Sequence, residues 1–100
     1  MKNISLVLAL FLCLACNKKE EVKVVEISCG QCQFGLTSED GCSLAVRFDD
    51  KAYFVDGAAI DDFGDAHAEG TGFCEVIRKA EVTGAVVNDR FQATAVNMLD

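Results

Sequence analysis

The sequence has few basic residues, a single histidine and no apolar run long enough to cross a membrane. Its 100 residues contain 9 Lys and Arg against 16 Asp and Glu. A small domain this acidic would repel the phosphates that dominate nucleic-acid affinity, which excludes nucleic acid as a partner. The same charge balance excludes a basic helix lying on a membrane surface. The apolar run at residues 4–15 is shorter than the roughly 20 residues of a spanning helix.

Sequence features of catalytic sites are also scarce. His67 has no nucleophile at a recognisable spacing, and there is no glycine-rich phosphate loop. The acidic pairs Asp49-Asp50 and Asp61-Asp62 are explained by turns and solvation, and the acids near His67 lack the spacing of an EF-hand loop. The sequence therefore predicts a protein that is not an enzyme and does not bind calcium.

The N-terminal residues have the pattern of an export signal. Met1-Lys2-Asn3 provides a positive start, an apolar run follows, and Leu14-Ala15-Cys16 precedes a polar stretch at residues 17–21. This resembles the signal of bacterial lipoproteins, in which a small residue precedes the cysteine that receives lipid, although Cys13 stands where that pattern usually has Leu. The resemblance implies a signal peptide over residues 1–15, lipidation at Cys16 with a polar tether over residues 16–21, and a domain over residues 22–100.

Removal of the signal makes the protein still more acidic. It deletes Lys2 and no acid, so the mature chain has a net charge of 8 − 16 = −8. Two acyl chains on Cys16 would anchor the chain stably to a membrane. We therefore expect a lipid-anchored protein of the bacterial cell envelope, on its periplasmic or its cell-surface face. The alternative is a secreted protein cut nearby.

The domain reads as mainly β with one helix. Alternating apolar residues or β-branched residues predict five strands. These strands are residues 22–27, 43–48, 51–56, 82–87 and 90–96. The turn pairs Asp49-Asp50 and Asn88-Asp89 join four of them into two hairpins. Only residues 73–80 show a helical period, with Thr71 as a candidate N-cap.

The order of these elements is β-β-β-α-β-β, which is that of a small five-stranded OB-like barrel. A small open α+β sheet or another Greek-key barrel are the alternatives. A chain this short buries only a thin core, so we expect a metal ion or disulfides to reinforce it.

Cysteine is the residue type that carries the chemistry. Outside the signal and the lipid site, the cysteines are Cys29, Cys32, Cys42 and Cys74. The Cys29-Gly30-Gln31-Cys32 text allows two thiolates to face one ion, and Cys42 and Cys74 would complete a set of soft ligands for Zn²⁺ or Cu⁺. Replacement of one cysteine by His67 gives a Cys₃His set as the alternative.

Two other interpretations of the cysteines remain open. An exported domain lives in an oxidising compartment, where four thiols normally form two disulfides. The domain would then be a stapled binding module for a protein or small ligand, without a metal. A thioredoxin-type redox motif is the least favoured interpretation, because a polar turn rather than a helix follows Cys32.

The chain also resembles an uncharacterised family of small exported bacterial proteins. The matching texts are CGQCQF from Cys29, GCSLAV from Gly41, GDAHA from Gly64 and GFC from Gly72. The resemblance implies a single site built from the four cysteines and the Asp-Ala-His text, and it implies no activity. We therefore predict a metal site at Cys29, Cys32, Cys42 and Cys74, with His67 as a further candidate ligand.

Overall fold

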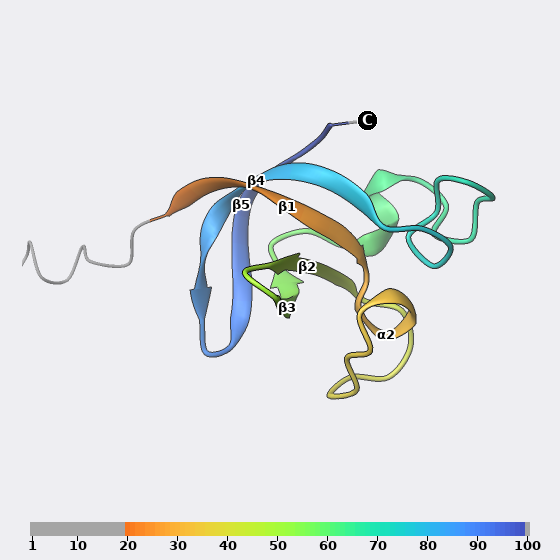
Figure 1. Ribbon diagram of the computed structural model, residues 1–100, viewed down its shortest axis with the longest axis horizontal. Coiled ribbons are helices and arrows are strands. Elements are labelled where there is room, and N and C mark those ends of the chain that lie inside the picture. The colour runs from red at the N-terminus through yellow and green to blue at the C-terminus, as the bar shows by residue number, and fades with distance from the viewer. Residues whose placement is uncertain (1–19, 100) are drawn as a thin grey trace, which may run out of the picture.

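The computed structural model describes residues 20–99, and its five strands close into a small barrel (Figure 1). In chain order the elements are β1 (Glu21–Cys29), the one-turn helix α2 (Gly30–Gln33), β2 (Leu44–Phe48), β3 (Lys51–Asp56), the 3₁₀ helix η1 (Ile60–Phe63), β4 (Arg78–Val87) and β5 (Arg90–Met98). Around the barrel the strands follow the order β1-β2-β3-β5-β4.

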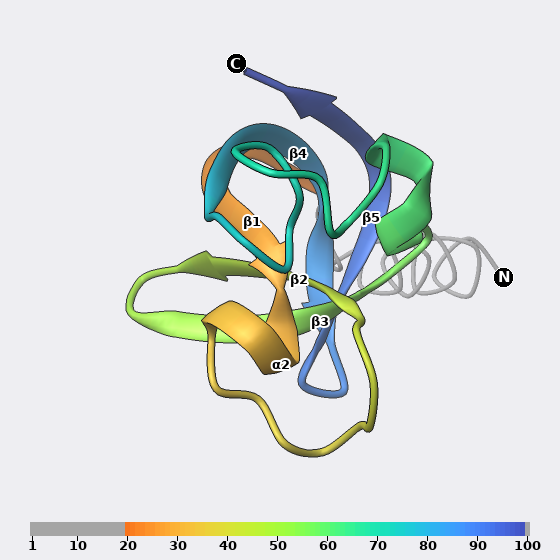
Figure 2. The same cartoon turned by 90° about the vertical axis from the view of Figure 1, so that its right-hand side faces the viewer.

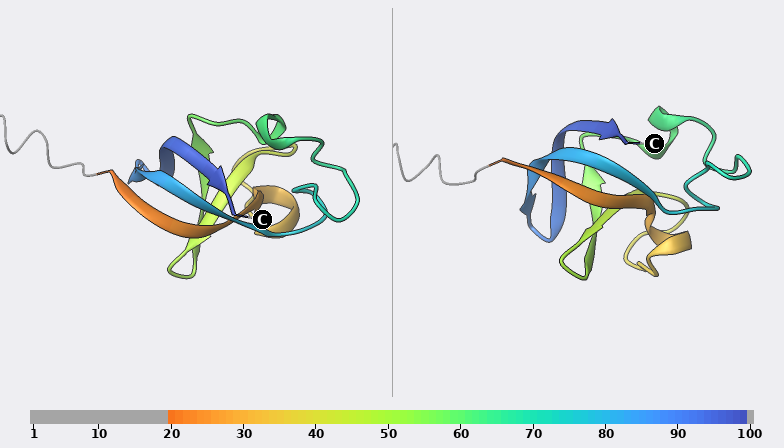
Figure 3. Two further views of the ribbon diagram at one scale, coloured as in Figure 1. Left: turned by 90° about the horizontal axis from the view of Figure 1, so that it is seen from above. Right: turned by 45° about the horizontal axis from the view of Figure 1, so that its top comes forward.

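Two pairings far apart in sequence close this barrel. The N-terminal strand β1 lies antiparallel to β4 over most of its length, from Glu21 opposite Gly84 to Ile27 opposite Arg78 (Figure 3). Strands β3 and β5 meet in parallel, with Val55 opposite Phe91. All other neighbours in the barrel are antiparallel. The predicted mainly-β, five-stranded OB-like barrel is thereby confirmed.

Both predicted hairpins are present with two-residue turns. Phe48 pairs with Lys51 across Asp49-Asp50, and Val87 pairs with Arg90 across Asn88-Asp89. The four turn residues have φ between 52° and 63°. Two successive residues with positive φ are the signature of a type I′ turn, whose twist matches that of the strands, and Asn and Asp tolerate this conformation better than most residues.

Each strand contributes a buried side chain to the barrel interior, and these side chains form one core cluster. Representative members are Ile27, Val46, Val55, Val82 and Phe91. On β1 the inward positions continue to the last residue of the strand, so that Cys29 is itself fully buried. The core therefore holds the first cysteine of the Cys-x-x-Cys text in place.

The predicted helix over residues 73–80 is wrong. The structure has turns at residues 71 and 73–75, and β4 already begins at Arg78, where the prediction began at Val82. Residues 78–84 pair with residues 21–27 of β1. This strand pairing overrides the local helical period of the sequence. The helix between β3 and β4 is instead the short 3₁₀ helix η1.

The segment before β4 is held by hydrogen bonds in place of helical ones. The Cys74 N–H donates to the carbonyl oxygen of Ala66 over 2.9 Å. Gly72 lies so close to this loop that a Cβ atom there would come within 2.2 Å of the same oxygen. Phe73 is buried in the core and contacts the ring of Phe63 in η1. Phe73, the first residue of the predicted helical face, thus anchors a loop.

Viewed from its right-hand side, the molecule shows α2 and the loop over residues 66–77 gathered at one end of the barrel (Figure 2). The start of β1 lies at the other end (Figure 1). Within residues 20–99, no helix is long and apolar enough to cross a membrane. The predicted signal peptide over residues 1–15 and the lipid acceptor Cys16 lie outside the described residues.

Candidate metal centre

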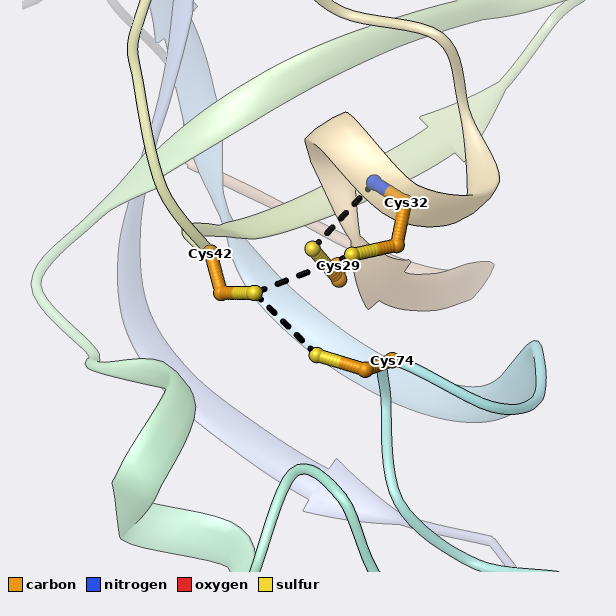
Figure 4. Close-up of side chains that lie close together, drawn as sticks. All are labelled: Cys29, Cys32, Cys42 and Cys74. Carbon is orange, nitrogen blue, oxygen red and sulfur yellow. Dashed lines mark hydrogen bonds between the residues drawn. The ribbon is translucent and has the colours of Figure 1, made fainter.

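The four cysteines of the domain meet at one point (Figure 4). They come from separate parts of the chain, namely the end of β1, helix α2, the loop before β2 and the loop before β4. Their sulfur atoms all lie within 4.8 Å of one another. This group, consisting of Cys29, Cys32, Cys42 and Cys74, is called the cysteine cluster below.

The sulfur–sulfur distances suit a tetrahedral ion. The Sγ atom of Cys42 is 3.7 Å from that of Cys32 and 3.2 Å from that of Cys74. Four thiolates at about 2.3 Å from a Zn²⁺ ion would be separated by about 3.8 Å along each edge of the tetrahedron. All four cysteines are free thiols, and the two disulfides of the alternative interpretation are not present in this structure. The sulfur–sulfur distances, from 3.2 Å to at most 4.8 Å, lie on both sides of this edge length, so shifts of up to about 1 Å would form a coordination shell.

The Cys-x-x-Cys text forms one helical turn directly after a strand. The Cys29 sulfur caps this turn by accepting the Cys32 N–H over 3.3 Å. Gly30 is buried, and a Cβ atom there would lie 2.7 Å from the ring of Phe54 and 3.0 Å from Ala45. The glycine is thus required because the turn packs closely on β2 and β3. A bend that only glycine can adopt is not the reason.

The two remaining cysteines are brought to this turn by backbone hydrogen bonds. The Gly30 N–H donates to the Ser43 carbonyl over 2.8 Å, which fixes the residue after Cys42. The Cys29 N–H donates to the Phe73 carbonyl over 3.1 Å, which fixes the residue before Cys74. Each outlying cysteine is therefore next to a residue that is bonded to the Cys-x-x-Cys turn.

The cluster distributes its protons unevenly. Burial raises the pKa of Cys29, but the hydrogen bonds it accepts from the Cys32 thiol and backbone outweigh this, and the pKa is lowered overall. The hydrogen bond to Cys29 raises the pKa of Cys32, with burial adding to the effect. Burial also raises the pKa of Cys74 to about 11. Cys29 is accordingly the sulfur that the other groups stabilise as a thiolate.

The cluster is open on one side. Cys29 is buried and Cys74 is half-buried, whereas Cys32 and Cys42 are exposed. A group in solution can therefore reach the sulfurs of the exposed pair while Cys29 stays covered by the core.

His67 is not a member of the cluster. Its side chain is exposed, and the group of sulfurs within 4.8 Å of one another contains only cysteine. The loop that carries it does contact the site, since the neighbouring Ala66 carbonyl accepts the Cys74 N–H. The structure thus presents a Cys₄ set and leaves the histidine of the Asp-Ala-His text outside it, so the Cys₃His set is not the one assembled.

Three polar residues that the sequence analysis did not single out surround the cluster. Ser28 is fully buried, and its hydroxyl lies 2.6 Å from the Phe73 carbonyl and 2.7 Å from the Val76 carbonyl. Gln31 and Gln33 bond to the loops that carry the other cysteines. Their position in the Ser-Cys-Gly-Gln-Cys-Gln text, between and beside the ligands, was the available signal.

Comparison with known protein families identifies the family to which the chain belongs. A model of a family of unknown function, DUF6370, matches residues 23–99, which is most of the chain and all four cysteines of the cluster. The chain belongs to this family. The predicted membership of an uncharacterised family is confirmed, and the family carries no activity that could be transferred. No curated protein and no solved structure matches the chain significantly.

Proposed function

We propose that this protein of the DUF6370 family binds a soft metal ion, Zn²⁺ or Cu⁺, through its cysteine cluster. The observation that supports this is the convergence of four thiols from four parts of the chain to within 4.8 Å of one another. Two separate disulfides would need only two close pairs. Thiolates are the ligands that Zn²⁺ and Cu⁺ prefer, and the absence of carboxylates from the group disfavours Ca²⁺ and Mg²⁺.

The proposed role is trafficking or sequestration of the ion rather than catalysis. Two of the four cysteines are exposed, so an ion held by the cluster can be reached by the ligands of a donor or acceptor. The net charge of −7 for the chain favours accumulation of cations near the site. We infer a binding protein in which the ion is cargo.

Direct metal analysis tests this proposal. The mature protein, purified without oxygen, is expected to retain about one equivalent of Zn²⁺ or Cu⁺ and to lose it on Cys32→Ser. His67→Ala is the matched control, and it should retain the ion because the imidazole lies outside the cluster. Loss of the ion on His67→Ala would replace the Cys₄ set by one containing the histidine.

A disulfide-stapled binding module without a metal is the competing function. It draws support from one contact, the 3.2 Å between the sulfurs of Cys42 and Cys74, which is shorter than the 3.7 Å between those of Cys42 and Cys32. Thiol titration of the protein exposed to air separates the two functions. Four titratable thiols together with a stoichiometric ion support the metal site, whereas no free thiols and no ion support the disulfides.

We further propose that the protein is anchored to the envelope by lipid on Cys16. The sequence pattern around Cys16 is the basis, and the arrangement of the domain suits it, because β1 starts at the end of the barrel away from the cluster (Figure 1). The open side of the cluster would then face away from the membrane. Cys16→Ala should abolish labelling by a fatty acid and move the protein out of the membrane fraction, and an unchanged fractionation would contradict the anchor.

A further inference from the structure

The polar residues of the Cys-x-x-Cys segment tie the two outlying cysteines to it. The Gln31 side chain accepts the Ser43 N–H over 2.8 Å, and its amide nitrogen lies 3.3 Å from the Glu39 carbonyl and 3.4 Å from the Asp40 carbonyl. These contacts fall on both sides of Cys42 in the chain. One side chain therefore fixes the whole segment that carries this cysteine.

Gln33 does the same for the other outlying cysteine. Its amide nitrogen donates to the carbonyl oxygen of Cys74 itself over 3.0 Å. Gln33 is the last residue of α2, and so its backbone is rigidly joined to Cys32. This hydrogen bond therefore fixes the position of the Cys74 backbone relative to Cys32.

The Cys42 segment has a second attachment, to the barrel. Glu39 forms an ion pair with Arg90 at the start of β5, and Arg90 also bonds to Asp56 at the end of β3 over 2.9 Å. The Ser43 hydroxyl donates to the same Glu39 carboxylate over 3.3 Å. The loop that carries Cys42 is therefore bonded on one side to Gln31 in the Cys-x-x-Cys turn and on the other side, through Glu39, to Arg90 in the barrel.

These contacts bear on which ion the cluster takes. Zn²⁺ in a site without water requires all four thiolates. Cu⁺ is satisfied by fewer, so that it loses little when one cysteine moves away. A device that holds the third and fourth sulfurs in place therefore favours the four-coordinate ion over Cu⁺.

We propose that Gln31 and Gln33 are positioning residues that hold Cys42 and Cys74 in the cluster, and that by enforcing four sulfur ligands they shift the preference of the site toward Zn²⁺ relative to Cu⁺. This rests on the proposed function, since it concerns the same cluster. The glutamines touch no ion; each acts through the cysteine-bearing loop to which it bonds, and the Gln31 side-chain oxygen also accepts a hydrogen bond from the Cys29 sulfur over 3.6 Å.

The test compares Gln31→Leu and Gln33→Leu with Gln92→Leu, the same change at an exposed position of β5. Zn²⁺ and Cu⁺ affinities are measured by competition with chelators, and Co²⁺ is used as a spectroscopic probe of the number of thiolates. We expect Zn²⁺ affinity to fall about 10- to 100-fold in either variant, as for other groups that orient ligands. Cu⁺ affinity should fall less, and Gln92→Leu should change neither.

The Co²⁺ spectrum provides the readout that a general loss of stability would not produce. The variants should lose intensity in the thiolate charge-transfer and ligand-field bands, whereas their metal-free circular dichroism should match that of the parent. Should the leucine variants fail to fold, Gln31→Ala and Gln33→Ala give the same comparison without a branched side chain.

A double-mutant cycle assigns each glutamine to its cysteine. Gln31→Leu should lose most of its effect on Zn²⁺ affinity once Cys42→Ser is present, with only its contact to the Cys29 sulfur remaining, but should retain its effect beside Cys74→Ser. Gln33→Leu should behave in the opposite way. If the parent binds no metal, the proposed function fails; if it binds Zn²⁺ with four thiolates and both variants match it, only the positioning role is overturned.

Discussion

Gly30 shows how a single residue admits the Cys-x-x-Cys turn to the barrel. The nearest atoms to a Cβ at this position would be in Phe54, Ala45 and Leu36, all within 3.1 Å. The φ of Gly30 is not in the left-handed region, so the requirement is for space. Any side chain there must push α2 away from β2 and β3.

We therefore expect Gly30→Ala to lower the free energy of unfolding by about 1–3 kcal/mol through overpacking. Chemical denaturation of the metal-free protein measures this. Phe54→Leu removes the closest ring atom, so the cost of Gly30→Ala should be smaller in that background. An equal cost in both backgrounds would show that the ring does not set the limit.

The protonation of individual cysteines sets how metal binding depends on pH. The pKa of Cys74 is raised to about 11 and that of Cys32 is also raised, so both thiols carry protons at neutral pH. A bound ion requires thiolates, and binding therefore releases at least these protons. Because the free protein holds protons that the bound form lacks, the apparent affinity must rise with pH.

Because at least two protons are released, the apparent Zn²⁺ affinity should rise at least about 100-fold per pH unit between pH 6 and pH 8. Competition titrations at several pH values give this slope, and titration in weak buffer counts the protons directly. Ser substitution at Cys74 should reduce the slope by one proton. An affinity independent of pH would mean that the thiols are already ionised.

At the scale of elements, the hairpin turns follow from local sequence. Asp50 has φ 63°, a left-handed conformation in which glycine has no steric penalty, and its side chain forms no ion pair among those found in residues 20–99. Asp89 has the same φ but pairs with Lys51 over 2.8 Å. Asp50 and Asp89 thus have the same left-handed backbone conformation, but only Asp89 has an ion pair that a substitution by glycine would remove.

Asp50→Gly should accordingly raise the free energy of unfolding by about 0.5–1 kcal/mol, because type I′ turns favour glycine at their second central position. Asp61→Gly, an exposed aspartate in η1 without positive φ, removes the same charge and should not stabilise. Thermal unfolding of both variants checks this. A gain in both would assign the effect to charge.

The segment before β4 shows where local pattern is insufficient. Phe73, Val76 and Ile77 have helical spacing, yet the structure places Phe73 in the core and leaves Ile77 exposed. The pairing of Arg78 and Lys79 with β1 determines the conformation of this segment, and the sequence of residues 73–80 does not by itself predict that pairing. Strands 43–48 and 51–56 were predictable because their turn and their alternation lie within a dozen residues.

At the scale of the whole molecule, the barrel and the cluster are separate sources of stability. The barrel is closed by the β1–β4 and β3–β5 pairings and filled by side chains from every strand. Of the four cysteines only Cys29 belongs to that buried core. An ion at the cluster would join α2 to the loops before β2 and β4 without contributing to the barrel interior.

Removal of the ion by a chelator under reducing conditions should therefore leave the β-sheet circular dichroism intact while lowering the melting temperature. Hydrogen exchange should show the reason: protection persists in β1, β4 and β5 and is lost in the loops that carry Cys42 and Cys74. Complete unfolding on metal removal, as in zinc fingers, would mean that the barrel depends on the ion.

The sequence by itself determined the presence of five strands, the two hairpin turns, the OB-like order and the identity of the four cysteines. These features follow from the patterns of residues that are close together in the chain. Only the tertiary structure decided that Cys74 enters from a loop, that His67 stays outside the cluster, and that Gln31 and Gln33 hold the outlying cysteines. Those outcomes depend on contacts between residues about 10 to 45 positions apart, which chain closure around a shared core selects and local propensity does not encode.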